Sequence, residues 1–229
     1  MSDAPGYFTD NAPILLMGVT GAQQEYLNDD EGEYGGKTAV ASWWADDPGR
    51  TRDLVLFLNP KADAVADVLD DFQEVTSVDE LAEAMGEGAR RLVLTPRTED
   101  WEAVSRRLAE FVGALPDDMT KLVVLDEAPE LDDDAVKRFV RVHGNGAETQ
   151  PLVLTQDPMA VDGSVVKMSL PVWVGPIKSS FKSWFDTHEY QDAYRHISED
   201  HDPFEWSVLI GKGPGEWHYY EPVPARYAT

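Results

Sequence analysis

The chain has 229 residues, of which 43 are acidic and 19 are basic, so its formal net charge at pH 7 is −24. This balance excludes a generally basic nucleic-acid coat protein, because broad neutralisation of phosphates needs an excess of Lys and Arg. The sequence contains no cysteine, which excludes disulfides and thiolate metal sites. No run approaches the roughly 18 apolar residues that a membrane-spanning helix needs, and the acidic, polar start does not resemble a signal peptide.

The acidic residues are spread along the whole chain, and arginine outnumbers lysine. Such a surface favours a protein that works in concentrated salt, because screening by ions removes the self-repulsion of like charges. We therefore expect an extremely halophilic source. The alternative is an acidic protein from an organism that lives at ordinary salt concentrations.

Apolar, β-branched runs bounded by turn residues recur along the chain. Continuous apolarity without polar alternation is typical of strands that are covered on both faces. The strands predicted in this way are residues 13–18, 53–58, 91–95, 121–126, 151–155 and 165–174.

Helical patterns lie between these predicted strands. A capping box at Ser77 and Glu80 marks the start of one helix, and apolar residues at helical spacing mark the others. The predicted helices centre on residues 39–44, 78–85, 101–115 and 135–140. This alternation of strands and helices predicts a doubly wound, mainly parallel α/β fold.

After residue 178 the alternation of apolar strands and helices gives way to a segment rich in aromatic residues. Aromatic residues at 181–194 predict a helix, and residues 206–210 and 217–220 predict a β-hairpin around a glycine-rich turn. We expect residues 1–11 to be disordered or extended and residues 12–229 to form a single domain.

A possible phosphate-binding motif stands just before the first predicted helix, at Gly35, Gly36, Lys37 and Thr38. Glycines let backbone N–H groups approach phosphates, and a helix N-terminus favours anions. The lysine would reach the outer phosphates, and the hydroxyl would hold Mg²⁺. The usual spacing of this motif places a further glycine at position 31, where this chain has Glu31.

A second fragment lies upstream, where the first predicted strand ends at Gly18 and is followed by Thr20 and Gly21. This is the usual first half of a phosphate loop. We predict that the two fragments form one phosphate loop that is split by an insertion at about residues 23–34, since this arrangement restores the order of strand, loop and helix. The alternative is that residues 18–25 form a loop without a ligand and that the second motif is an unrelated surface turn.

Carboxylates and an amide follow the later strands. Asp126 and Glu127 end the predicted strand at 121–126, and Gln156 follows the predicted strand at 151–155. In parallel sheets, ligands bind at the carboxyl ends of strands. Asp126 would orient the Mg²⁺ shell, Glu127 would polarise an attacking water, and Gln156 would sense the outer phosphate or position that water. The alternative for Asp126 and Glu127 is a solvated acid pair at the end of a strand.

Together these pieces resemble the additional-strand P-loop ATPases, in particular the FtsK–HerA group and the zonula occludens toxin-like (Zot-like) assembly ATPases. The closing segment, residues 202–228, resembles the end of ATPases encoded by haloarchaeal viruses and proviruses. The resemblance implies a P-loop NTPase fold of the RecA/ASCE type that binds ATP and Mg²⁺. It implies a role in DNA translocation, packaging or virion assembly, in the cytoplasm or associated with the virion.

The resemblance also implies a homo-oligomeric ring, in which an arginine from a neighbour stabilises charge on the transferring phosphoryl group. Arg97, at the end of the third predicted strand, is a candidate for this arginine, as are Arg138 and Arg141. DNA is a candidate partner, and the pairs at residues 90–91 and 106–107 are either local DNA contacts or solvated helix ends. The rival hypothesis is a catalytically inactive P-loop-like scaffold that binds partners.

Overall fold

The computed structural model describes most of the chain in several stretches. They are residues 12–18, 36–47, 51–61, 65, 69, 71–142, 148–175, 177, 179–200, 205–210, 212 and 215–221. The predicted extended N-terminus at 1–11 and the predicted insertion at 23–34 lie outside these residues.

The described residues form one nine-stranded sheet in the order β3-β4-β2-β5-β6-β1-β7-β8-β9. Its strands are β1 (Ile14–Gly18), β2 (Leu54–Leu58), β3 (Gln73–Val75), β4 (Arg91–Leu94), β5 (Lys121–Leu125), β6 (Thr149–Thr155), β7 (Leu170–Val174), β8 (Trp206–Leu209) and β9 (Trp217–Tyr220). The pairs from β3 to β7 are parallel, and β8 and β9 add antiparallel to the edge at β7. The predicted mainly parallel sheet and the C-terminal hairpin are both confirmed.

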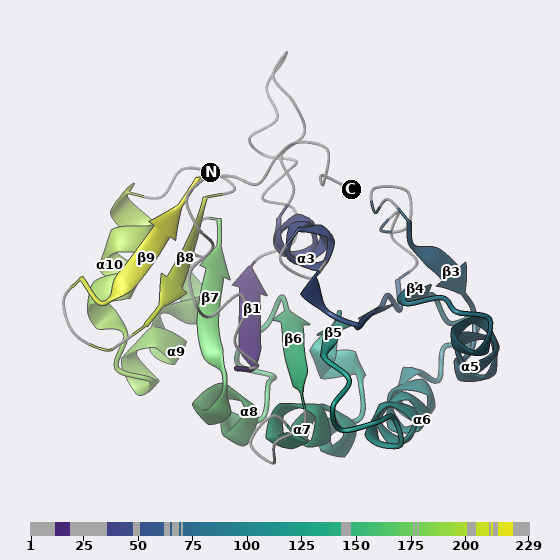
Figure 1. The fold of residues 1–229 in the computed structure, drawn as a ribbon. Coiled ribbons are helices and arrows are strands. Elements are labelled where there is room, and N and C mark those ends of the chain that lie inside the picture. Colours follow the sequence, from purple (N-terminus) through teal and green to yellow (C-terminus); the bar gives the residue numbers. More distant parts are fainter. Residues whose placement is uncertain are drawn as a thin grey trace, which may run out of the picture.

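Helices cover both faces of the sheet (Figure 1). They are α3 (Lys37–Asp46), α5 (Val78–Gly86), α6 (Trp101–Gly113), α7 (Asp133–Val142), α8 (Gly163–Met168), α9 (Lys182–Thr187) and α10 (Gln191–Asp200). One apolar core joins the sheet to α5 through α10, and a second joins its other face to α3. The central strands are buried on both sides, which explains why they read as unbroken apolar runs.

The run at 165–174, predicted as one strand, forms two elements. Its first part belongs to α8 and its second part is β7. The Asp162 side chain accepts a hydrogen bond from the N–H of Ser164 at 2.8 Å and so caps the start of α8. A capping side chain provides a local partner for the first helical N–H groups, which the apolar pattern alone does not reveal.

The aromatic segment at 181–194, predicted as one helix, is interrupted. It contains α9 and the start of α10, with Glu189 between them in the left-handed region at φ 65°. The short edge strand β3 was not predicted, because its three residues have one buried position and no apolar run.

An aromatic cluster ties the C-terminal hairpin to α3. Trp206 of β8 lies 5.7 Å from Trp43 and 6.5 Å from Trp44, and it stacks on Tyr220 of β9 at 4.2 Å, all between ring centroids. Such contacts add to the burial of the rings themselves. The hairpin is therefore packed against the helix that begins at the candidate phosphate motif.

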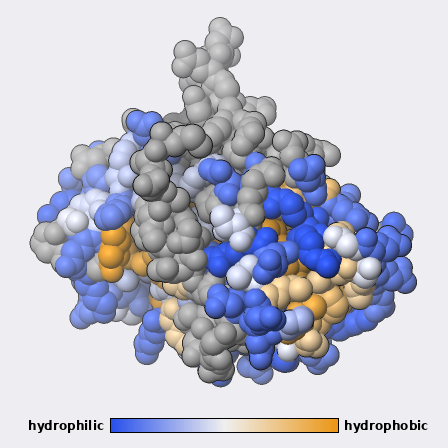
Figure 2. Space-filling view, viewed as in Figure 1, coloured by the Kyte–Doolittle hydropathy of each residue, from blue (hydrophilic) through white to orange (hydrophobic). Residues whose placement is uncertain are grey.

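Hydrophilic residues cover much of the surface on the face that Figure 2 shows. Within the described stretches, no helix combines the length and the apolar character that crossing a bilayer requires.

Candidate functional site

The strand order gathers the candidate residues at one edge of the sheet. Strand β6 lies between β1 and β5, and β2 lies on the far side of β5. Because these strands are parallel, their carboxyl ends meet at the same edge. Gly18 ends β1, Glu127 follows β5, and Gln156 follows β6.

Gly18 is required by a close approach of two backbones. A Cβ atom at this position would lie 2.9 Å from the carbonyl oxygen of Val174, its partner on β7. Real Cβ contacts are essentially never that short, so the glycine lets β1 end tightly against β7.

The described residues at the start of α3 suit an anion. Gly36 is its N-cap residue and provides no side-chain hydrogen bond, and the first turn contains no acidic residue. The helix dipole and the first N–H groups therefore favour negative charge at this end. Lys37, the first residue of α3, is only 8% exposed, and Thr38 follows it half-buried.

Asp126 and Glu127 form a tight turn beyond β5. The Asp126 N–H donates to the carbonyl of Leu58 at 3.1 Å, and the Asp126 carboxylate accepts the N–H of Glu127 at 2.9 Å. Glu127 adopts the left-handed conformation, at φ 52° and ψ 46°. Both residues are buried, so this turn is not a solvated acid pair at a strand end.

Three side chains converge on one oxygen atom of Glu127. The Oε1 atom lies 2.7 Å from the Nζ atom of Lys61, 3.8 Å from the Nζ atom of Lys37, and 2.6 Å from the Nε2 atom of Gln156, which donates to it. The structure thus brings together Lys37, Glu127 and Gln156, which the sequence analysis chose from three separate segments.

Lys61 is the residue of this cluster that the sequence analysis missed. It follows β2, three residues beyond the end of that strand at Leu58. The available signal was its position at the carboxyl end of a predicted strand, the edge where ligands bind. A single lysine after Asn59 and Pro60 matches no motif, so the sequence alone does not single it out.

The remaining predicted site residues lie apart from this cluster or outside the described stretches. Arg97 is exposed in the loop after β4, and β2 separates β4 from β5. Its exposure leaves it accessible to a neighbouring molecule. Thr20, Gly21 and Gly35 lie outside the described residues, so the split phosphate loop stays a prediction.

The arginine pairs named as local DNA contacts are engaged within the chain. Arg106 pairs with Asp132 at 2.8 Å, and Arg107 pairs with Asp79 at 2.8 Å. Arg91 lies 3.4 Å from Asp46 and stands over the ring of Phe72. Arg90 donates to the carbonyls of Met85 and Ala89. These internal contacts explain the two arginine pairs without any need for a contact with DNA.

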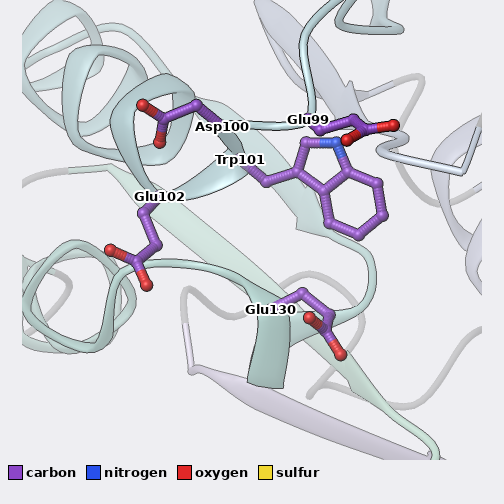
Figure 3. A pocket seen from close by; sticks show the side chains of 5 residues that line it. All are labelled: Glu99, Asp100, Trp101, Glu102 and Glu130. Carbon is purple, nitrogen blue, oxygen red and sulfur yellow. The ribbon is translucent and has the colours of Figure 1, made fainter.

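A hollow at the same edge of the sheet is acidic. Figure 3 shows Glu99, Asp100 and Glu102 near the start of α6, with Trp101, and Glu130 from the short turn of helix after β5. Four carboxylates around one indole ring would repel phosphate groups. This hollow is therefore not the phosphate site.

The residues at the cluster fit a nucleotide with its metal ion. A buried ammonium at a helix N-terminus suits phosphate oxygens. Thr38 and Asp126 carry oxygen atoms of the kind that Mg²⁺ prefers and would hold the ion.

The chain matches no protein-family model and no curated protein sequence. Its fold is similar to that of the genome-packaging NTPase B204 from Sulfolobus turreted icosahedral virus 2. The complex with ATP-gammaS gives a TM-score of 0.63 at 10% identity, over 93% of this chain and 98% of that one. The complex with AMP gives 0.64 at 10% identity, with the same coverage.

The DNA-packaging ATPase B204 from Sulfolobus turreted icosahedral virus gives a TM-score of 0.63 at 10% identity, over 94% of this chain and all of that one. At such low identity the likeness concerns the fold. The chain therefore shares the α/β fold of these NTPases, and its sheet has β6 between β1 and β5.

Proposed function

We propose that this chain binds and hydrolyses ATP and acts in DNA translocation, DNA packaging or virion assembly. The observation that carries the proposal is the convergence of Lys37 and Gln156 on Glu127, at the carboxyl edge of a P-loop NTPase sheet. A cation, a carboxylate and an amide at this edge are groups that can take part in phosphoryl transfer.

Each side chain has a distinct task in this proposal. Lys37 and the first N–H groups of α3, with the glycine at 36, hold the phosphates. Thr38 and Asp126 hold Mg²⁺, which when bound neutralises charge on the phosphate oxygens. Glu127 accepts a proton from the attacking water, and Gln156 orients the Glu127 carboxylate and senses the outer phosphate.

The biological setting is proposed from two observations. The fold is similar to that of packaging NTPases from viruses of Sulfolobus, which supports a role in packaging. The net charge of −24 supports a halophilic source, and we propose a virus or provirus of a halophilic archaeon. Ring assembly, with Arg97 completing a neighbour's site, belongs to this proposal.

One observation favours a second candidate, a P-loop-like scaffold without turnover. The chain has Glu31 where the phosphate loop normally has glycine, and a carboxylate there would repel phosphates. Such a subunit would keep the fold and bind partner proteins in place of nucleotide.

Hydrolysis of ATP tests the proposal against this alternative. The protein is assayed in multimolar KCl with Mg²⁺, with and without DNA, beside Lys37→Ala and Glu127→Gln. The control is Lys212→Met, which breaks a different lysine–carboxylate ion pair. The Nζ atom of Lys212 lies 2.6 Å from the Oε2 atom of Glu189. The proposal expects turnover in the wild type and the control and its loss in both site variants. Turnover that survives Lys37→Ala, or a wild type that does not hydrolyse ATP, would contradict it.

A further inference from the structure

Lys61 belongs to the candidate site through the pairing of β2 with β5. These strands are neighbours, with Leu58 beside Leu125, and the hydrogen bond from Asp126 to Leu58 extends this pairing beyond the strand ends. The loop after β2 therefore lies next to the turn that presents Glu127. The side chain of Lys61 is 41% exposed, whereas that of Glu127 is 9% exposed.

The contacts of Glu127 occupy the oxygen that faces the cluster. A carboxylate oxygen accepts through two lone pairs. Lys61 and Gln156 both lie at hydrogen-bond distance from Oε1, at 2.7 Å and 2.6 Å, and Lys37 lies farther away at 3.8 Å. In this arrangement both lone pairs of Oε1 are engaged by Lys61 and Gln156.

Lys61 is also placed to meet a phosphate that Lys37 holds. Both ammonium groups approach the same oxygen atom of Glu127, so a phosphate group in contact with Lys37 lies in the neighbourhood of both. A lysine side chain is a flexible stem with a compact charge, and the exposure of Lys61 leaves it room to change partners. An outer phosphate carries more negative charge than a carboxylate and so competes with Glu127 for this ammonium.

We propose that Lys61 exchanges Glu127 for the outer phosphate of a nucleoside triphosphate, so that Lys61 selects triphosphate over diphosphate. This inference rests on the proposed function of the site. It adds a residue that determines specificity for the nucleotide.

Equilibrium binding separates this role from that of an ordinary surface ion pair. The dissociation constants of a non-hydrolysable ATP analogue and of ADP are measured with Mg²⁺ for the wild type, Lys61→Met and Lys61→Arg, with Lys212→Met as the matched control. Because Lys61 gives up its contact with Glu127 when it meets the phosphate, only the difference between the two contacts favours binding. We therefore expect Lys61→Met to weaken binding of the analogue about fivefold and to change ADP binding less than about twofold. Lys61→Arg keeps the charge and should restore most of the preference.

A double-mutant cycle with Glu127→Gln tests the exchange itself. Removing the charge of Glu127 removes the competitor for Lys61, so Glu127→Gln should tighten binding of the ATP analogue. In the Lys61→Met background the part of this tightening that comes from Lys61 should disappear. Additive effects of the two substitutions would overturn the exchange.

The outcomes distinguish this inference from the proposed function. If Lys61→Met affects both nucleotides equally, or affects neither, the proposed role of Lys61 is overturned. The proposed nucleotide site would still be supported in that case if the wild type binds nucleotide and Lys37→Ala does not. A wild type that binds neither nucleotide would overturn both.

Discussion

Glu127 adopts a left-handed backbone conformation although it is not a glycine. Such a conformation costs on the order of 1 kcal/mol or more and persists where the surrounding contacts require it. Here the Asp126 carboxylate accepts the N–H of Glu127, and Gln156 holds its side chain. The strain thus serves to direct a buried carboxylate toward Lys37.

The hydrogen bond from Gln156 to Glu127 makes a specific kinetic prediction. Gln156→Ala leaves the phosphate contacts of Lys37 in place but frees the carboxylate to rotate. We expect kcat for ATP hydrolysis to fall about tenfold or more with little change in KM, because the lost contact orients the base. Gln191→Ala, on α10 and away from the site, serves as the control. A change confined to KM would contradict this assignment.

At the scale of single elements, the end of β1 depends on the absence of a side chain at Gly18. Gly18→Ala would place a Cβ 2.9 Å from the backbone oxygen of Val174, and strained packing of this kind costs about 1–3 kcal/mol. We expect a lower midpoint of thermal unfolding. In Gly163→Ala, at the first residue of α8, the added Cβ would meet nothing within 4 Å, so this matched variant should keep its stability. Equal midpoints for the two variants would refute the steric explanation.

The Asp162 carboxylate that caps α8 predicts how the stability of the fold changes at low pH. The pKa of Asp162 is held below its ordinary value by hydrogen bonds from the Ser164 side chain and N–H and by Lys137. A carboxyl whose pKa is lowered on folding stabilises the fold above its unfolded pKa of about 3.9 and loses this contribution as pH falls further. We expect Asp162→Asn to reduce the dependence of stability on pH below about 4. Acid unfolding followed by circular dichroism measures this effect, and identical pH profiles would contradict it.

At the scale of the whole molecule, the net charge of −24 predicts stability that depends on salt. The screening length falls from about 10 Å at 0.1 M to about 3 Å at 1 M salt, so repulsion between surface carboxylates weakens as salt is added. We expect the midpoint of thermal unfolding to rise steadily between about 0.1 M and 3 M KCl. A midpoint that does not change with KCl would favour the alternative of an acidic protein adapted to ordinary salt.

The sequence was sufficient for the elements whose signals are local. Continuous apolar runs predicted the central strands, and the capping box predicted α5, where the N–H of Glu80 donates to Ser77 at 3.2 Å. The strand order could not be predicted in the same way, because it depends on packing between distant segments. The break at Glu189 and the edge strand β3 likewise depend on their surroundings.

The same distinction holds at the candidate site. Lys37, Glu127 and Gln156 follow motifs and were predicted, and their contacts now place them together. Lys61 has no motif and became visible only when β2 was seen to lie beside β5. The pairing of β2 with β5 therefore identifies Lys61 as a residue of the site, which its own sequence segment does not.

A crystal structure of the protein with a non-hydrolysable ATP analogue and Mg²⁺ would show whether the cluster around Glu127 is a nucleotide site. We expect the phosphates at the N-terminus of α3, with the Lys37 ammonium on the outer phosphates and Asp126 and Thr38 facing the metal ion. We also expect Lys61 to have left Glu127. A nucleotide bound elsewhere, with Lys37 still against Glu127, would rule out this site.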